Sequence, residues 1–336
     1  MTFSAKGFET KYGNNITVDV LNGFTDYVLI TQPEPWALVK DSVVNKPRKI
    51  VLAGELSPEY LNHLADSMPK TTIVGLGGGS AMDTAKWIHW RRDLPLFQIP
   101  SLPSVDACFT RMSALRDKGG VRYEGDSVPE MVYVDFELFR SAPRPMVTSG
   151  IGDVLSCHTA WFDWKFAADN KQDEYGWNDE MPKVSLTYLE ELNSCAPGIN
   201  EMTDDGLRRL MELLRDIGWR CHEFKHARFE EGSEHFFAYT FEQVTGRTIL
   251  HGELVTMGTL LMSYFQGNDY EGVREIVSRA GTRHKLGELN VSEKEVIDSV
   301  RQLASYTREQ NHWYSHAMFI DSKKIKDSEI LDLLNF

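Results

Sequence analysis

Short apolar runs alternate with helix-compatible segments through the first part of the chain. Each run is uninterrupted and four to six residues long, and turn residues follow it. The runs are YVLIT (residues 27–31), KIVLA (49–53), TTIVGL (71–76) and LFQI (96–99). The helical segments begin at Trp36, at Pro58 (to Met68) and at Ala81. Continuous apolar runs between helices are typical of a parallel sheet covered on both faces, so this part predicts a doubly wound α/β domain.

The pattern changes after MVYVD (residues 131–135). From about Thr148 onward, long helical patterns follow one another with few strand signals. They cover residues 153–168, 207–221, 234–245, 253–265 and 293–308. An Ala-Pro-Arg-Pro turn lies between residues 142 and 145 and marks the joint. The sequence predicts an α/β dinucleotide-binding domain over residues 1–148 and an all-α domain over residues 149–336.

Charge and composition narrow the function classes. The formal net charge is −13, which argues against a nucleic-acid binder, because phosphate recognition normally requires a basic face. No segment approaches the roughly 18 apolar residues needed to span a bilayer, and the N-terminus lacks the features of a signal peptide. The four cysteines stand far apart with no CxxC pair, which favours reduced thiols. We therefore expect a cytoplasmic protein without a membrane span, acting on a small molecule.

A glycine-rich loop stands where a phosphate could bind. The stretch GLGGGSAMDTAK places Gly77, Gly78, Gly79 and Ser80 between a predicted strand and a predicted helix. Glycines let the backbone approach a pyrophosphate closely, and the helix N-terminus offers free N–H groups. The spacing is neither GxGxxG nor that of a P-loop. Asp83, in the first helical turn, either belongs to this site or complements the helix dipole.

Three helix-associated residues are candidate metal ligands. Asp153 follows two glycines at the start of a helix, His235 lies in GSEHFFAYTFE, and His251 lies in ILHGE, sixteen positions later. One carboxylate and two imidazoles suit a divalent transition metal with an open coordination position. The residues alone leave other roles open, because Asp153 could cap its helix and most histidines are not ligands.

The motifs together resemble a known family. GGGSAMDTAK, IPSLPSVD, MVYVDFELFRSAPRPMVTSGIGD, HTAWFDWKFA, EEGSEHFFAYTFE and LHGELVTMGTLLM have the order and spacing of glycerol-1-phosphate dehydrogenases. These enzymes belong to the iron-containing alcohol dehydrogenase and dehydroquinate synthase-like superfamily. The resemblance runs from about Tyr27 to Phe265. It implies a dehydroquinate synthase-like fold and a metal-dependent, NAD(P)-linked dehydrogenase acting on dihydroxyacetone phosphate or a related polyol or sugar phosphate. Members of the superfamily often form homo-oligomers.

The resemblance also implies roles for single residues. Asp153, His235 and His251 match the metal ligands, commonly of zinc or iron. The three glycines and Asp83 match the pyrophosphate loop, beside Ser80. The remaining matches are Ser101 and Ser104, which line the cofactor, and Asp106, which lies near the substrate hydroxyls. In the implied reaction, the metal acts as a Lewis acid on the substrate oxygen while the nicotinamide exchanges a hydride with the adjacent carbon.

Several positions depart from the family pattern, and these departures bear on which substrate the protein binds. Val105 stands where the family usually has a histidine beside the substrate aspartate. Arg111 follows shortly after and is either an anion anchor or a salt-bridge residue. Near the C-terminus, QNHWYSH (residues 310–316) replaces a common Arg-Tyr-Thr stretch, and its His312 and His316 either line a pocket or pack among aromatic side chains.

The sequence leaves alternatives open for both the cofactor and the reaction. The residues after the first strand, Thr31-Gln32-Pro33-Glu34, offer no clearly placed acid for a ribose 2′-hydroxyl and no arginine for a 2′-phosphate, so both NAD and NADP are expected. The alternative enzyme class is a dehydroquinate synthase-like lyase or cyclase with a transient internal hydride transfer. A third hypothesis is a degenerate homologue that serves as a binding protein, against which the retention of all three candidate ligands argues.

Overall fold

The computed structural model describes residues 7–117 and 120–336 and divides them into two units. The first unit runs to Val147 and also includes Leu214–Glu223. The second comprises Thr148–Leu213 and Phe224–Phe336. One boundary therefore falls between Val147 and Thr148. No change of composition in the sequence marks the segment 214–223, which is the C-terminal half of a long helix.

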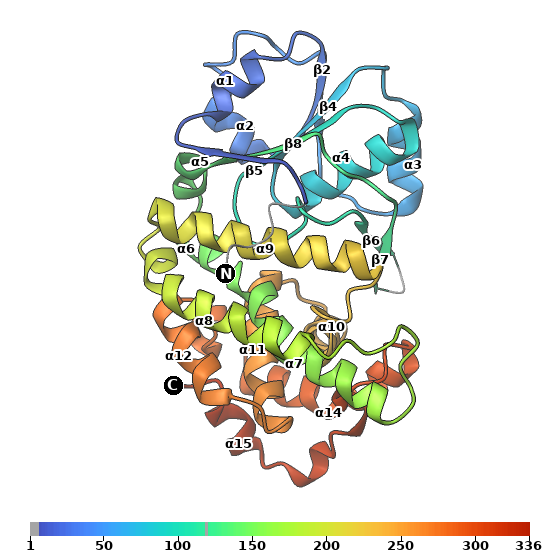
Figure 1. Cartoon of the computed structure of the whole chain (residues 1–336), viewed down its shortest axis with the longest axis vertical. Coiled ribbons are helices and arrows are strands. Elements are labelled where there is room, and N and C mark those ends of the chain that lie inside the picture. Colours follow the sequence, from blue (N-terminus) through green and yellow to red (C-terminus); the bar gives the residue numbers. More distant parts are fainter. Residues whose placement is uncertain (1–6, 118–119) are drawn as a thin grey trace. The chain divides into compact units, whose positions relative to one another are not determined.

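The first unit is built on a six-stranded parallel sheet (Figure 1). Its order is β1-β8-β5-β4-β2-β3, and every neighbouring pair is parallel. The strands are β1 (Thr10–Gly13), β2 (Tyr27–Thr31), β3 (Lys49–Leu52), β4 (Thr72–Gly77), β5 (Leu96–Pro100) and β8 (Met131–Asp135). An antiparallel pair, β6 (Ser113–Asp117) and β7 (Gly120–Glu124), lies outside the sheet. The predicted doubly wound α/β architecture is confirmed.

Helices cover both faces of this sheet, because successive strand residues point to opposite sides. Val28, Ile30 and Ile73 pack in one core with α3 (Pro58–Asp66) and α4 (Gly79–Arg92). The adjacent strand residues Leu29 and Val74 point to the other face. They pack in a second core with α1 (Thr17–Asn22), α2 (Pro33–Val39) and α5 (Phe136–Ser141). Helix α2 begins three residues before the predicted Trp36, since Pro33 fits the first turn of a helix.

The second unit is helical throughout. Every regular element in residues 148–336, all of whose backbone the structure describes, is a helix. The helices are α7 (Ile151–Asp169), α8 (Met181–Asn200), α10 (Ser233–Thr245), α11 (His251–Phe265), α12 (Tyr270–Ala280), α13 (Leu286–Leu289), α14 (Glu293–Glu309), η1 (His316–Phe319), η2 (Ser322–Lys324) and α15 (Asp327–Asp332). The short helix α6 (Arg144–Thr148) precedes them, and α9 (Asp204–Phe224) passes through the division between the units.

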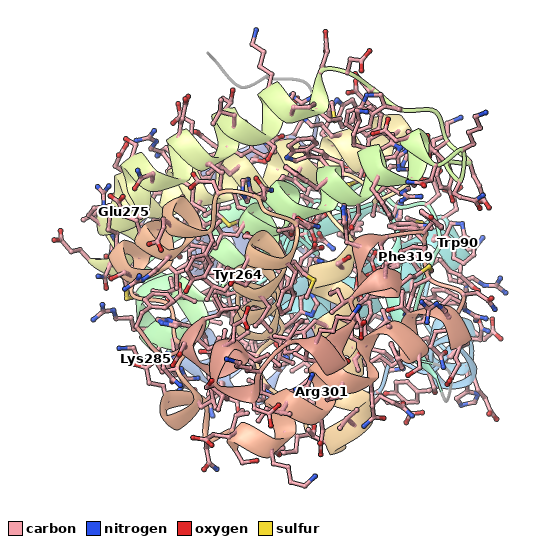
Figure 2. All side chains as sticks on the ribbon, turned by 90° about the horizontal axis from the view of Figure 1, so that it is seen from below. Trp90, Tyr264, Glu275, Lys285, Arg301 and Phe319 are labelled. Atoms are coloured by element: carbon pink, nitrogen blue, oxygen red, sulfur yellow. The ribbon has the colours of Figure 1, made fainter. Side chains whose placement is uncertain are left out.

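Helix α11 is the central helix of this unit, since residues 252–263 are all buried. By contrast, α14 is amphipathic and begins at a capping box formed by Ser292 and Glu295. Arg301 of α14 donates to the carbonyl of Ile325 at 2.9 Å, and the Tyr264 hydroxyl donates to Glu329 at 3.0 Å. These two side chains, labelled in Figure 2, hold the C-terminal segment onto the unit. No described helix is both long and apolar enough to cross a bilayer.

A buried histidine in α7 makes the stability of the fold sensitive to acid. His158 is 6% exposed, and burial lowers its pKa from 6.5 to about 4, with Asp269 opposing the shift. Between these two values the unfolded chain takes up a proton that the folded chain does not. The free energy of unfolding therefore falls by about 3 kcal/mol as the pH drops from 6.5 to 4.

We expect His158→Asn to reduce the loss of unfolding free energy at acidic pH. Urea unfolding between pH 4 and 8 would measure it, and the variant's curve should be flatter than that of the wild type below pH 6.5. Above pH 7 the two curves should run parallel, because the imidazole is neutral in both states there. Equal slopes below pH 6.5 would contradict the role of His158.

Candidate metal centre and cofactor loop

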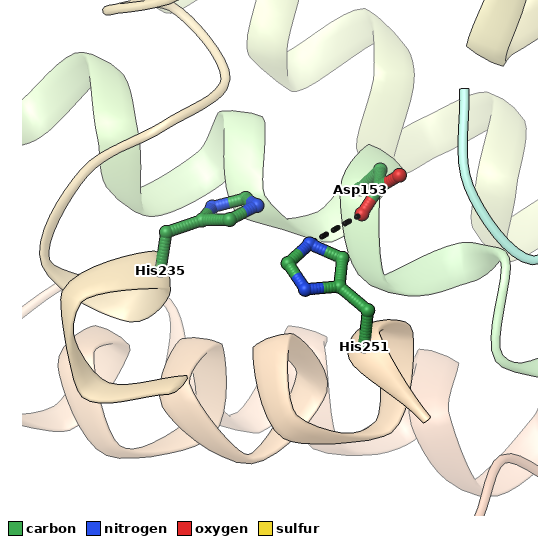
Figure 3. A group of neighbouring side chains, drawn as sticks. All are labelled: Asp153, His235 and His251. Carbon is green, nitrogen blue, oxygen red and sulfur yellow. Dashed lines mark ion pairs between the residues drawn. The ribbon is translucent and has the colours of Figure 1, made fainter. Parts of the chain in front are cut away.

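Asp153 and His251 are brought together by a close crossing of α7 and α11. A Cβ added to Gly152 would lie 2.4 Å from the carbonyl oxygen of Gly252 and 2.7 Å from its Cα, so this crossing requires glycine. Asp153 follows Gly152 in α7, and His251 precedes Gly252 as the first residue of α11. Their side chains approach with Asp153 Oδ1 3.8 Å from His251 Nε2 (Figure 3).

His235 comes from a second close crossing. It lies in the first turn of α10, and a Cβ on Gly258 of α11 would lie 2.3 Å from the carbonyl oxygen of Glu234, the residue before it. His235 is buried, as is Asp153, whereas His251 is half-buried. One ligand atom from each of the three side chains lies within 4.8 Å of the other two, and Figure 3 shows them converging from three helices.

Glu234 fixes the orientation of His235. Its Oε1 is 3.0 Å from His235 Nδ1, so this nitrogen carries the hydrogen and leaves Nε2 to face the triad. Thr159 Oγ1 and the backbone N–H of Gly232 donate to the same carboxylate at 2.7 and 2.6 Å. Burial alone would lower the pKa of His235, but the hydrogen bond and charge of Glu234, with Glu231 and Asp153, raise it to about 9. These negative surroundings favour a cation.

The donor set fits a divalent metal ion. One carboxylate and two imidazoles are the ligands that zinc and iron take in catalytic sites. The 3.8 Å between Asp153 Oδ1 and His251 Nε2 is too long for a hydrogen bond. Two ligand atoms that each lie about 2.1 Å from the same ion can be up to roughly 4.2 Å apart. The observed separation therefore allows both atoms to bind one ion. The carboxylate of Glu234 behind His235 supplies the outer partner typical of metal-binding histidines.

The glycine loop connects β4 to α4, as the sequence predicts. Gly78 is the N-cap of α4 and offers no side chain to the first-turn N–H groups, an arrangement that can receive a phosphate. Gln32 lies at the end of the neighbouring strand β2. Its Oε1 accepts from the Gly78 N–H at 2.8 Å, and its Nε2 donates to Ser80 Oγ at 3.0 Å. The φ of Gly77 is +157°, and a Cβ there would lie 2.8 Å from the Cβ of Ala81, so this position requires glycine.

The loop after β5 lies beside the glycine loop. The Ser101 N–H donates to the carbonyl of Gly77 at 2.8 Å, and a Cβ on Gly79 would lie 3.1 Å from the Val105 side chain. Ser104 follows in the same loop and is half-buried. The structure thus places Ser101 beside the glycine loop. The cofactor roles of Ser101 and Ser104 stay predictions.

Two predicted aspartates of the first unit are buried. Asp83 Oδ1 is 2.9 Å from Nζ of the fully buried Lys86, which also donates to Thr110 at 2.8 Å. Burial raises the pKa of Asp83, and the charge of Lys86 opposes this shift. The carboxylate of Asp83 is therefore engaged within α4. Asp106 is also buried, and its role near the substrate stays a prediction.

The residues that depart from the family pattern have partners of their own. Arg111 forms an ion pair with Asp126, and its Nη1 lies 3.1 Å from His222 Nε2, which corresponds to the salt-bridge alternative. His312 stacks on Phe236 at 4.4 Å between ring centroids, so it packs among aromatic side chains. Burial lowers its pKa to about 4. His316 Nδ1 is 2.8 Å from the buried Asp163.

Glu234 and Gln32 are not among the residues predicted for the site. Neighbouring residues of a helix normally face different directions, so the position of Glu234 directly before His235 does not suggest a contact. Gln32 and Gly78 are forty-six residues apart, and only the pairing of β2 with β4 brings them together. The one available signal for Gln32 was its place at the end of a buried strand, where dinucleotide-binding folds place a residue that contacts the ribose.

Sequence comparison gives the family. The profile of the iron-containing alcohol dehydrogenases matches residues 31–143. The glycerol-1-phosphate dehydrogenase [NAD(P)+] of Saccharolobus solfataricus is 32% identical over 305 residues, which are 88% of this chain and 86% of the relative. The enzyme of the same name from Sulfurisphaera tokodaii is 26% identical over 302 residues, covering 85% and 86% of the two chains.

Solved structures agree on the fold. A glycerol dehydrogenase from Schizosaccharomyces pombe superposes with a TM-score of 0.71 at 20% identity and covers 98% of this chain and 88% of its own. A sulfoacetaldehyde reductase from Bifidobacterium kashiwanohense, in complex with NAD+, gives 0.64 at 16% identity and covers 100% and 98%. The chain therefore belongs to the glycerol-1-phosphate dehydrogenase branch of the iron-containing alcohol dehydrogenase family.

Proposed function

We propose that this enzyme is a metal-dependent, NAD(P)-linked dehydrogenase that interconverts a small ketone and its alcohol. The ketone is dihydroxyacetone phosphate or a related polyol or sugar phosphate. One observation carries the proposal: a carboxylate and two imidazoles from three helices converge to within 4.8 Å. The relatives named above are dehydrogenases, so they do not support the lyase alternative or a non-enzymatic role.

The proposed roles follow from these contacts. Asp153, His235 and His251 would hold zinc or iron, which when bound supplies a Lewis acid that polarises the substrate oxygen. Glu234 orients His235, and the glycine crossings position the helices that carry the ligands. NAD or NADP supplies or accepts the hydride.

The nucleotide would bind in the first unit. Gly77, Gly78, Gly79 and Ser80 would receive its pyrophosphate at the N-terminus of α4, with Ser101, Ser104 and Asp83 nearby. In this proposal residues 1–148 bind the dinucleotide, whereas residues 149–336 bind the metal and the substrate. The role of Asp106 near the substrate hydroxyls stays a prediction of the sequence. A cytoplasmic location and a homo-oligomeric state stay predictions of the sequence.

A ketone panel tests the proposal. The metal-replete protein should oxidise NADH or NADPH when given a small hydroxyketone. A chelator should abolish this turnover, and added zinc or ferrous ion should restore it. Product formation without net consumption of NAD(P)H would instead support the lyase alternative. Full turnover after removal of the metal would contradict the proposal.

A further inference from the structure

Gln32 joins the end of β2 to the glycine loop that follows β4. The parallel pairing of these strands places Thr31 opposite Leu76, so the next residue, Gln32, lies beside the loop. Gln32 Oε1 accepts from the Gly78 N–H at 2.8 Å, and Gln32 Nε2 donates to Ser80 Oγ at 3.0 Å. Both ends of the amide therefore bind the glycine loop.

The backbone determines which way round the Gln32 amide lies. The Gly78 N–H can only donate, so the amide oxygen must face it and the amide nitrogen must face Ser80. The Ser80 hydroxyl accepts from this nitrogen, and its own hydrogen remains available to donate. No described residue accepts a hydrogen bond from this hydroxyl. The orientation of Gln32 thus makes Ser80 a donor.

The surroundings of the Ser80 hydroxyl are donors of the same kind. Gly79 and Ser80 are the second and third residues of the loop and the first two of α4, so their N–H groups have no acceptor within the helix. An ionised diphosphate offers only acceptors. The loop therefore presents two N–H groups and, because of Gln32, one hydroxyl hydrogen to such a group.

The other side of the loop is held without Gln32. The Ser101 N–H donates to the carbonyl of Gly77 at 2.8 Å, and Ser101 follows β5, which pairs with β4 on the side away from β2. Gln32 itself is half-buried. A change of its side chain should therefore release Gly78 and Ser80 while leaving the sheet and the Gly77 end of the loop in place.

We propose that Gln32 is a positioning residue for nucleotide binding, which holds Gly78 and directs the hydroxyl hydrogen of Ser80 to the pyrophosphate of NAD or NADP. This inference rests on the proposed function, because it concerns the nucleotide assigned to the loop. It gives Gln32 a role other than recognition of the ribose, since both ends of its amide already bind the loop. Gln32 therefore contributes equally to the affinity for NAD and for NADP.

Calorimetric titration of Gln32→Met with NADH, NADPH and ADP tests this role. Methionine keeps the length of the side chain but removes both hydrogen bonds. We expect each Kd to rise about tenfold, as is typical for one hydrogen bond to a charged group. With metal-loaded enzyme and saturating NAD(P)H, kcat should change less than about twofold. Gln302→Met makes the same substitution at an exposed position of α14 and should leave every Kd unchanged.

A double-mutant cycle shows whether Gln32 acts through Ser80. Ser80→Ala alone should weaken ADP binding, because it removes the donated hydrogen bond. In the Ser80→Ala protein, Gln32→Met should raise the Kd for ADP by only about threefold or less, since coupled residues are not additive. Fully additive losses would overturn the proposed action through Ser80.

Gln32→Glu keeps the shape of the side chain and provides a second variant. Its carboxylate only accepts, so the Ser80 hydroxyl must donate to it instead of to a phosphate. The Kd for ADP should rise at least about tenfold, and the added charge acts in the same direction. Wild-type affinity for ADP in this variant or in Gln32→Met would overturn the inference.

The remaining outcomes separate the inference from the proposed function. A loss confined to NADH or to NADPH overturns the inference, because Gln32 would then recognise the ribose. If the wild type binds these nucleotides but reduces no ketone, the proposed reaction fails, and the titrations still decide the role of Gln32. If the wild type binds none of the three ligands, both the inference and the proposed function are overturned.

Discussion

Replacing His251 with alanine should abolish metal retention and ketone turnover while leaving the chain folded. The variant keeps only Asp153 and His235 of the three candidate ligands. Loss of even an outer partner of a metal ligand typically costs 10- to 100-fold in affinity, so loss of a ligand should cost at least about 100-fold. The fold should survive because His251 is half-buried at the first residue of its helix and takes little part in the core. Metal content and NAD(P)H oxidation measure the two effects.

The exposed His63 of α3 provides the control. His63→Ala removes the same side chain from the first unit and should retain one metal equivalent and wild-type turnover. Circular dichroism would show that both variants remain folded. If His251→Ala turned over ketone at the wild-type rate with only trace metal present, the proposed metal centre would be wrong.

The fold was largely predictable because its central strands β2, β4 and β5 are buried on both faces. β2 covers the predicted residues 27–31, and β4 and β5 each end one residue beyond the predicted run. β1, with only four residues at the edge of the sheet, has no long apolar run and was not predicted. Helix α8 was also not among the predicted segments, since Pro197 and Gly198 near its end interrupt the helical pattern.

The candidate site was predictable only in part, because its residues come from distant parts of the chain. Residue types and resemblance identified Asp153, His235 and His251, but their spacing along the chain says nothing about their separation in space. Convergence depends on helix crossings between residues about a hundred positions apart, such as Gly152 and Gly252. The contacts of Glu234 with Thr159 and with the backbone near Gly258 also join distant parts of the chain. A single sequence therefore indicates candidate ligands more readily than the residues that position them.

Gly152→Ala should have the second large effect, because the added methyl group should push α7 and α11 apart where they cross. The added Cβ would lie 2.4 Å from the carbonyl oxygen of Gly252, a backbone atom that cannot rotate away. Overpacking of this kind costs roughly 1–3 kcal/mol of unfolding free energy. Since Asp153 and His251 adjoin the two glycines, the 3.8 Å between their ligand atoms should increase as the helices part. We expect metal affinity and turnover to fall together, even under conditions in which the variant is fully folded.

Gly287→Ala is the matched control in the same unit. Gly287 lies in α13, and a Cβ added there would point into open space beside the helix. Alanine is the better helix former by up to about 1 kcal/mol, so this variant should be as stable as the wild type or slightly more stable, with unchanged metal content. Urea unfolding and metal analysis compare the two variants. If Gly152→Ala unfolded at the wild-type urea concentration and bound metal normally, the close crossing could not be what positions Asp153 and His251. Reduced metal binding at unchanged stability would instead show that the helices shift without loss of packing, and that the ligand geometry alone depends on this glycine.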